Sequence, residues 1–368
     1  MRITLVAFHF TEYSIELANA LASGNEVLLV VNKENFLQAT EGRTADFIQP
    51  GVNVFADSHY TYKNPRILQN IFLLIRKIRN FRPDIIHVQE SSSLVLMLTL
   101  MALAKIPYNV TVHDPIVHIG EKDKTKFRRT WIKNRIRKGA SGIIVHGEYL
   151  KSVMVHQLGF RENAVFVMPH GALFYYRKWC QQTCERKHSI LFFGRMYRYK
   201  GLECLIEAIP LIKKEVPNLS VIIAGSGPEL ERLRDKIVDD STYEIYDQYI
   251  PNHLLAKLFE ETSLVVLPYL EATQSGVIAT AYAFGKPVVT TTVGSIPEMV
   301  DDGETGCLVK PQKPEDFAAS VLQLLMHDNK RKEMGQNAFQ KAHTDLSWNR
   351  IAQKTIEVYG KVIELTKE

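Results

Sequence analysis

The sequence predicts an α/β protein built from two doubly wound, Rossmann-like domains. Its 368 residues fit two domains, because a domain takes about 150 residues on average. Short apolar, β-branched runs alternate with amphipathic stretches along most of the chain, which is the pattern of parallel strands covered by helices. Aromatic, basic and polar residues interrupt this pattern between residues 173 and 188. We therefore expect an N-terminal domain at 1–172, a linker at 173–188 and a second domain at 189–347.

In the first domain, each predicted strand is a continuous apolar run, as expected for parallel strands that are buried on both faces. The predicted strands are 3–8, 27–31, 84–88, 108–112 and 142–145. Helical periodicity predicts helices at 12–22, 66–80 and 94–104. These elements alternate in the order of repeated βαβ units.

The second domain repeats the same alternation. Strands are predicted at 190–193, 220–224, 264–267 and 287–290, and helices at 202–213, 229–237, 252–260, 277–284 and 314–326. A last helix at 348–365 has no following strand to cover, so we expect residues 348–368 to cross back to the first domain. Because doubly wound sheets bind ligands beyond the carboxyl ends of their strands, the functional site is expected in a cleft that the two domains face.

Composition excludes several classes of protein. The chain is 46% hydrophobic and 23% charged, which excludes a disordered or fibrous protein. Its four cysteines are too few and scattered for a disulfide-stapled fold, and the pair Cys180 and Cys184 lacks further ligands for zinc. We see no signal peptide, and the longest apolar run, 94–104, is about half of what a bilayer crossing needs. A cytoplasmic globular protein is expected.

Two loops of the second domain suggest phosphate binding. The segment 193–201 follows a predicted strand and carries Arg195 and Lys200 before a helix begins. A guanidinium, an ammonium and the N–H groups of a helix start would together suit a diphosphate. The turn at 224–229 places Gly225 where the backbone would approach a ligand. The alternative is that Arg195 and Lys200 are ordinary solvated side chains that bind no phosphate.

A third loop, at 268–276, follows a predicted buried strand and leads into a helix of small residues. The N–H groups of Gln274, Ser275 and Gly276 at this helix start would hold an anion. The carboxylate of Glu271, a few residues earlier, would accept sugar hydroxyls. The loop is therefore a candidate site for both the phosphate and the sugar of one ligand.

The order of motifs is more specific than any one of them. Between residues 189 and 345 the chain contains GR-x4-KG, AGSGPE, an acidic loop after LP, GKPVV, G-x-I-PE and DGETG. The first half contains RPDIIHVQ, TVHD, GIIVHGEYLK and MPHG. This set resembles the retaining, GT-B-fold nucleotide-sugar glycosyltransferases of family 4. The resemblance implies that the second domain binds the donor and the first domain receives the acceptor.

The resemblance assigns roles to individual positions. Arg195 and Lys200 match the cations that neutralise the donor's diphosphate, and the loop 271–276 matches the segment that holds the donor sugar and its phosphate. His113 matches the histidine beside the anomeric carbon and the 6-hydroxyl of the sugar. With Asp114 it forms a polar pair directly after a buried strand, so we expect both as catalytic residues.

The chain departs from the family pattern at two places. The family's two glutamates, eight residues apart, fall on Ala272 and Thr280; Glu271 would replace the first, and Thr280 stands at the ribose-binding position. At the end of the first strand, where many members have a glycine pair, this chain has bulky residues at 8–10. We expect His9, Thr11 and His118 on the acceptor side.

Two basic amphipathic segments, 66–82 and 122–138, carry much of the chain's excess positive charge. Basic amphipathic helices with aromatic residues can lie on anionic membranes, whereas the alternative is a solvated basic face on an ordinary packed helix. Stacking aromatics are not arrayed on any predicted strand, so no nucleic-acid partner is expected.

The sequence thus predicts a retaining, metal-independent hexosyltransferase without a cofactor. Its donor would be a nucleotide diphosphate sugar, UDP being the family's most frequent choice, and its acceptor a hydroxyl of a lipid-linked or growing surface glycan. The alternatives are a catalytically silent sugar-nucleotide-binding subunit and a nucleotide-sugar 2-epimerase. A periplasmic sugar-binding protein is disfavoured by the lack of a recognisable signal peptide.

Overall fold

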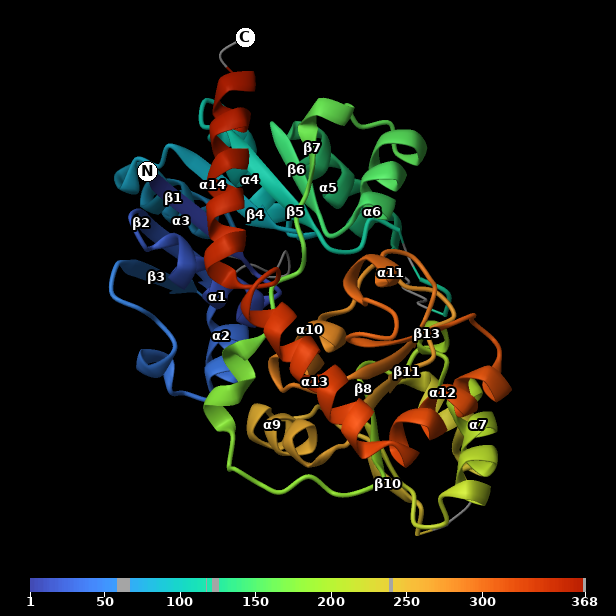
Figure 1. Ribbon diagram of the computed structural model, residues 1–368. Coiled ribbons are helices and arrows are strands. Elements are labelled where there is room, and N and C mark those ends of the chain that lie inside the picture. The colour runs from blue at the N-terminus through green and yellow to red at the C-terminus, as the bar shows by residue number, and fades with distance from the viewer. Residues whose placement is uncertain (58–66, 117, 121–125, 238–240, 367–368) are drawn as a thin grey trace. The chain divides into compact units, whose positions relative to one another are not determined.

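Figure 1 shows the computed structural model, which describes residues 1–57, 67–116, 118–120, 126–237 and 241–366. The chain divides into two compact units. The first comprises Met1–Pro115, Lys122–Pro169 and Trp348–Glu368, and the second comprises Ile116–Glu121 and His170–Ser347. Each unit is a parallel sheet with helices on both faces, which confirms the predicted fold class of two doubly wound α/β domains.

The sheet of the first unit has the strand order β3-β2-β1-β4-β5-β6-β7, and all its pairings are parallel. Its strands are β1 (Arg2–Ala7), β2 (Glu26–Asn32), β3 (Val52–Asp57), β4 (Ile85–Gln89), β5 (Tyr108–Val112), β6 (Gly142–Val145) and β7 (Val165–Val167). Strand β1 pairs with both β2 and β4, so the chain order reverses there. Ligands of open α/β sheets bind beyond the carboxyl ends of the strands at such a reversal.

One face of this sheet is covered by α3 (Ile67–Phe81), α4 (Leu94–Ala102) and α5 (Lys126–Gly139), with α4 in contact with both neighbours. The other face carries α1 (Thr11–Leu21) and α14 (Trp348–Leu365), which pack on each other. The buried residues of α14 recur at helical spacing, so one stripe of this helix covers the sheet. The remaining helical segments are α2 (Lys33–Thr40), α6 (Glu148–Ser152), η1 (Thr44–Asp46), η2 (Val153–Gln157) and η3 (Glu162–Ala164).

The second unit repeats this plan with the order β10-β9-β8-β11-β12-β13, again with parallel pairings. Its strands are β8 (Ser189–Phe193), β9 (Ser220–Ala224), β10 (Tyr243–Tyr246), β11 (Leu264–Leu267), β12 (Val288–Thr291) and β13 (Gly306–Val309). The chain order reverses between β8 and β11. The loops that follow these two strands are therefore the expected ligand-binding loops.

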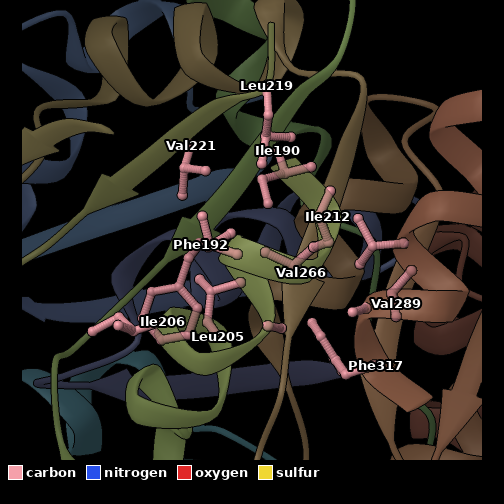
Figure 2. Close-up of a cluster of buried hydrophobic side chains, with 14 of the residues drawn as sticks. Ile190, Phe192, Leu205, Ile206, Ile212, Leu219, Val221, Val266, Val289 and Phe317 are labelled. Atoms are coloured by element: carbon pink, nitrogen blue, oxygen red, sulfur yellow. The ribbon is translucent and has the colours of Figure 1, made fainter. Parts of the chain in front are cut away.

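Helices α7 (Leu202–Glu215), α8 (Pro228–Leu233) and α12 (Pro314–Met326) contribute to the core on one face of this sheet. Helices α9 (Asn252–Glu261), α10 (Gly276–Ala283) and α13 (Asp328–His343) cover the other face. Shorter helical segments are η4 (Phe174–Trp179), η5 (Arg198–Lys200), η6 (Arg234–Lys236) and α11 (Ile296–Met299). Figure 2 shows how strand residues such as Phe192 and Val266 meet Leu205 of α7 and Phe317 of α12.

The sequence did not predict the edge strands β3, β7, β10 and β13. Each is only partly buried, and none of them forms the continuous apolar run by which the central strands were recognised. Helix α13 was also missed, because its sequence DNKRKEMGQNAFQKAH is mostly polar. Only one side of it, including Met334, Ala338 and Ala342, is buried.

The segment 173–188 is the one that we expected to link the two domains. It belongs to the second unit, and its helical segment η4 packs against α9 and α10. Tyr175 and Trp179 of η4 are buried, which explains the aromatic composition of the segment. The N–H of Arg186 also donates to the carbonyl of Glu261 over 2.7 Å. The chain leaves the first unit at Pro169 and enters the second unit at His170.

Candidate active site

In the second unit, the loops after β8, β9 and β11 are joined by main-chain hydrogen bonds. The Met196 N–H donates to the Ser226 carbonyl over 2.9 Å, and the Glu229 N–H donates to the Met196 carbonyl over 3.0 Å. The Leu270 N–H donates to the Tyr199 carbonyl over 2.8 Å. Loops far apart in sequence are therefore held together at the carboxyl ends of the central strands.

Glycines make this close approach possible. A Cβ at Gly225 would overlap the carbonyl oxygen of Gly194, and a Cβ at Gly201 would overlap the carbonyl oxygen of Pro268. Both glycines also have positive φ, at +131° and +75° respectively. The missing side chain of Gly225 thus makes room for the loop after β8, and its expected approach to a ligand stays a prediction.

The two predicted cations lie in this assembly of loops. Arg195 is exposed and donates to the Tyr199 hydroxyl over 3.2 Å. Lys200 is half-buried; its Nζ donates to the Tyr269 hydroxyl over 3.3 Å and lies 4.4 Å from the centre of that ring. The Tyr269 and Ser275 hydroxyls are 2.9 Å apart, and burial raises the pKa of Tyr269. The ammonium is thus connected through two hydroxyls to the start of α10.

The start of α10 has the groups of an anion site. Ser275 caps the helix, because its Oγ accepts from the Ile278 N–H over 3.3 Å, and Gly276 is the first helical residue. Among the described residues, the Oε1 of Gln274 is buried and has no hydrogen-bond partner. The N–H groups and the helix dipole at a helix start favour negative charge there.

Thr280 lies elsewhere in the same helix and has another role. Its Oγ1 donates to the Gly276 carbonyl over 2.8 Å, and the residue is only 2% exposed. Ala272 is also buried. The Thr280 hydroxyl is therefore bonded inside α10, and its expected contact with the donor stays a prediction.

Glu271 is partly buried and contacts residues that we had expected on the acceptor side. One carboxylate oxygen accepts from the Ile119 N–H over 3.2 Å, and the other lies 3.5 Å from Nδ1 of His118. The His118 ring stacks on Tyr199 with 4.4 Å between ring centres, and its Nε2 lies 3.4 Å from the Thr273 hydroxyl. His118 is thus held among loops of the second unit, and its expected place on the acceptor side stays a prediction.

In the first unit, polar side chains meet at the ends of β4, β5 and β6. The Nε2 of His113 is 2.9 Å from the Gln89 Oε1, and its Nδ1 is 3.3 Å from Nε2 of His146. The Nδ1 of His146 lies 3.0 Å from the Met168 carbonyl oxygen. Burial lowers the pKa of His146 to about 4, and His113 is fully buried. Both ring nitrogens of His113 thus face protein groups.

An aromatic ring covers one side of His113. Phe10, at the start of α1, stacks on the imidazole with 3.8 Å between ring centres, and the Tyr13 ring meets it edge-on. Among the expected acceptor residues nearby, Thr11 is buried, whereas His9 is exposed. Partial burial, followed by the charges of nearby basic side chains, lowers the pKa of His9.

The other expected catalytic residue, Asp114, is partly exposed, and its carbonyl oxygen accepts from Arg137 over 3.1 Å. The guanidinium of Arg137 also forms an ion pair with Glu90, and both side chains are nearly fully buried. Lys133 lies 3.7 Å from the same carboxylate. A charged cluster therefore fixes α5 to the ends of β4 and β5.

His87 has a structural role, in agreement with the packing expected from its sequence context. Its ring nitrogens lie 2.6 Å from the Tyr359 hydroxyl and 2.7 Å from the Thr111 hydroxyl. Burial lowers the pKa of His87 to about 3. The neutral ring thus ties α14 to the sheet.

The described residues contain neither a metal-binding cluster nor a membrane-spanning helix. No group of three or more His, Cys, Asp or Glu side chains is placed to hold a metal ion in the parts of the chain that the structure describes. Among the described helices, none is long and apolar enough to span a bilayer. The four cysteines are unpaired thiols.

The sequence reasoning missed several residues of these two regions. Gln89 and His146 carry the same signal as His113, because each stands at the carboxyl end of a buried strand. Tyr199 and Tyr269 have no comparable signal, because their contacts depend on loops that are distant in sequence. Phe10 was noted only as a departure from a glycine pair.

Comparison with known proteins identifies the family. The sequence pattern of Glycosyltransferase Family 4 matches residues 11–172, and that of Glycosyl transferases group 1 matches residues 187–327. This chain is a GT-B glycosyltransferase of group 1.

Three of the similar proteins span nearly its whole length. A D-inositol 3-phosphate glycosyltransferase of Pseudarthrobacter chlorophenolicus is 28% identical over 96% of this glycosyltransferase and 90% of the relative. HepE of Anabaena, solved with UDP and glucose, aligns over 98% of this chain and 99% of its own, with a TM-score of 0.72 and 19% identity. Sucrose-phosphate synthase of Thermosynechococcus elongatus aligns over 99% of both chains, with a TM-score of 0.71 and 18% identity. At such low identity the two structures establish the fold alone.

Proposed function

We propose that this glycosyltransferase moves a hexosyl group from a nucleotide diphosphate sugar to a hydroxyl group, with retention at the anomeric carbon. The observation that carries the proposal is the arrangement of Arg195, Lys200 and the start of α10 in one assembly of loops. Lys200 is linked to Ser275, the cap of α10, through the Tyr269 hydroxyl. Two cations and helix N–H groups match the charge of a diphosphate.

The reaction needs this charge most as the diphosphate leaves. The bond between the anomeric carbon and the phosphate oxygen breaks, and the acceptor oxygen bonds to the same face of the sugar. The departing phosphate takes the proton of the acceptor hydroxyl, so no covalent intermediate is required. Arg195 and Lys200 stabilise the negative charge that grows on the phosphate, which is the service that a divalent ion provides in metal-dependent transferases. We therefore propose that transfer is independent of metal.

UDP-glucose is the first donor to test. HepE of Anabaena, which shares the fold, was solved with UDP-glucose. The buried, unpartnered Oε1 of Gln274 would accept a hydrogen bond from a hydroxyl of the bound donor, since buried polar atoms rarely remain without a partner. Glu271 would accept a second hydroxyl after giving up its contact with His118.

A donor panel separates this proposal from its alternatives. UDP-, GDP- and ADP-hexoses are added to the protein in EDTA, and thermal stability is measured; a ligand of the native state raises the melting temperature. The preferred donor is then incubated with glycan and lipid-linked acceptors, and the product's anomeric configuration is read by NMR. Transfer with retention in EDTA supports the proposal. Inversion, or activity only with Mg2+ or Mn2+, contradicts it.

A silent donor-binding subunit is the second candidate function, and the absence of both family glutamates, at Ala272 and Thr280, favours it. It predicts a thermal shift with a nucleotide sugar but no product with any acceptor. A 2-epimerase would instead release a free epimerised sugar.

We further propose that the acceptor is lipid-linked and that the first unit lies on an anionic membrane. Helices α3 and α5 contain no acidic residue within their described bounds. They expose Leu68 and Phe72 of α3 and Phe127 and Trp131 of α5, at 77%, 62%, 88% and 52% respectively. Large exposed apolar side chains beside basic residues are the composition of an interfacial helix surface. The expected segments 66–82 and 122–138 begin outside the described residues, at 66 and at 122–125.

Vesicle sedimentation tests the membrane proposal. The protein should pellet with phosphatidylglycerol vesicles at low salt and be released as ionic strength rises, because the attraction is screened. The variant with Phe127 and Trp131 changed to serine should bind more weakly, whereas Tyr149→Ser, which removes an exposed aromatic residue from α6, should not. Equal sedimentation with neutral and anionic vesicles would contradict the proposal.

A further inference from the structure

Phe10 occupies an unusual backbone conformation at the carboxyl end of β1. Its φ and ψ are 58° and 45°, in the left-handed region that bulky residues rarely adopt. Hydrogen bonds hold the backbone at Phe10 and at Phe8, two residues earlier. The Ser14 N–H and Oγ both donate to the Phe10 carbonyl, over 3.0 and 2.7 Å, and the Asn35 side-chain amide donates to the Phe8 carbonyl over 2.7 Å.

This conformation places the Phe10 ring on His113. The two ring centres are 3.8 Å apart and the planes differ by 18°, so the contact is a stack. Phe10 remains 37% exposed, whereas His113 has no exposed surface. Of the two stacked rings, the one available to a ligand is the phenyl ring.

The nitrogens of His113 are already in use. They face Gln89 at 2.9 Å and His146 at 3.3 Å, and the Tyr13 ring closes another side of the imidazole. His113 is thus held as a fixed support beneath Phe10. Backbone strain that persists at a strand end, where sheets of this type bind ligands, is more often retained for function than by chance.

We propose that Phe10 is the specificity-determining residue of the acceptor side, and that its exposed face binds the apolar C–H face of a pyranose ring. His113 is then a positioning residue that holds the phenyl ring flat. The proposal rests on the proposed function, because it names the acceptor class as a sugar ring. An aromatic side chain suits such a ligand, since it offers a large rigid surface at low cost in side-chain entropy.

Binding is tested first in the absence of nucleotide, so that the result does not depend on turnover. Methyl α-D-glucopyranoside and methyl α-D-galactopyranoside are added to the protein, and saturation-transfer NMR reports which protons contact it. Sorbitol, which has the hydroxyls but no ring, is the control ligand. We expect transfer to the ring C–H protons with wild type and Phe10→Tyr, and at least a fivefold loss with Phe10→Gly. Equal signals in Phe10→Gly, or no preference over sorbitol in wild type, would overturn the proposal.

Two further measurements test the geometry itself. The imidazole C–H protons of His113 should resonate further downfield in Phe10→Gly than in wild type or Phe10→Tyr, because the stacked ring no longer shields them; the exposed His156 is the internal reference. Phe10→Gly should also melt at a higher temperature than Phe10→Ala, because glycine adopts the left-handed conformation without strain. Unchanged His113 shifts, or a more stable alanine variant, would show that Phe10 does not stack on His113 in solution.

Turnover then separates the two proposals. If transfer occurs, Phe10→Gly should raise the acceptor KM while leaving the UDP-glucose KM unchanged. If pyranosides bind through Phe10 but no donor sugar is transferred, the proposed function fails and the role of Phe10 stands. If transfer occurs with an acceptor KM that does not respond to Phe10, the role of Phe10 fails alone.

Discussion

The strand ends of the two units are built in opposite ways. In the second unit, main-chain hydrogen bonds hold the loops together across glycines, and the cations Arg195 and Lys200 remain exposed or half-buried. In the first unit, buried side chains hold one another, as in the contacts of His113 with Gln89 and His146. The polar groups of one region are available to a ligand, whereas those of the other mainly support the fold.

This difference predicts two kinds of response to substitution. Side chains on the loops of the second unit should be removable at a cost in activity and little cost in stability. Polar side chains at the strand ends of the first unit should be costly to remove, because each leaves a buried partner without its hydrogen bond or charge. The glycines of the second unit are the exception, since the loops pack through them.

The largest expected effect is on stability, from Glu90→Ala. This change leaves the buried guanidinium of Arg137 without its ion pair, which typically costs about 3–5 kcal/mol. Urea unfolding measures the loss. The control is Glu26→Ala, which removes an exposed pair with Arg2 at 3.4 Å and should cost less than about 1 kcal/mol. Similar losses in both variants would refute the contrast between buried and exposed charges.

Arg195→Ala and Lys200→Ala should each lower kcat/KM about a hundredfold, or about 3 kcal/mol, because each removes charge needed as the diphosphate leaves. Their urea midpoints should stay near that of wild type. Arg198→Ala is the matched control, since it removes an exposed cation from the same loop and should keep wild-type activity. Equal activity in all three variants would remove the donor site from this loop.

Gly225→Ala should destabilise the second unit more than Gly303→Ala. Both glycines have positive φ, so alanine costs about 1 kcal/mol at either position. A Cβ at Gly225 would also overlap the Gly194 carbonyl, which should add about 2 kcal/mol, whereas no atom lies within 4 Å of a Cβ at Gly303. Thermal unfolding measures the difference. Matching melting temperatures would mean that the loops are not packed through Gly225.

A further effect concerns pH and the first unit. Burial lowers the pKa of His87 to about 3 and of His146 to about 4, from an ordinary 6.5. Below pH 6.5 these two histidines become protonated in the unfolded chain but stay neutral in the folded chain. The free energy of unfolding therefore decreases as the pH is lowered, by up to about 1.4 kcal/mol per pH unit for each histidine.

Urea unfolding at pH 7 and pH 5 measures this slope. His87→Gln should make it shallower, whereas His156→Gln, at an exposed position, should leave it unchanged. An unaltered slope in His87→Gln would show that His87 is not held neutral in the folded protein.

The central strands could be predicted from the sequence because their signals are local, and the loops proposed to bind the donor carry local signals too. A buried parallel strand is a continuous apolar run, and Arg195, Lys200 and the glycines of the second unit lie within short motifs. The edge strands lack that run. Motif order also carried the family assignment, which the comparisons confirm.

The remaining features depend on contacts between distant segments. His118 was expected with the acceptor residues, but the stacking partner that holds it, Tyr199, lies 81 residues away and is not marked by any motif. The bond of the Thr280 hydroxyl is different, because it reaches the Gly276 carbonyl only four residues earlier, as threonine hydroxyls inside helices commonly do. The stack of Phe10 on His113 requires a left-handed backbone that the sequence does not predict for phenylalanine.

The most direct test of the central claim compares the affinities of UDP and uridine by calorimetry, in EDTA. If Arg195 and Lys200 neutralise the diphosphate without metal, wild type and Arg198→Ala should bind UDP far more tightly than uridine. In the double variant Arg195→Ala/Lys200→Ala that preference should largely disappear, while uridine affinity stays the same. If the double variant prefers UDP over uridine as strongly as wild type does, these two residues do not bind the diphosphate and the account is contradicted.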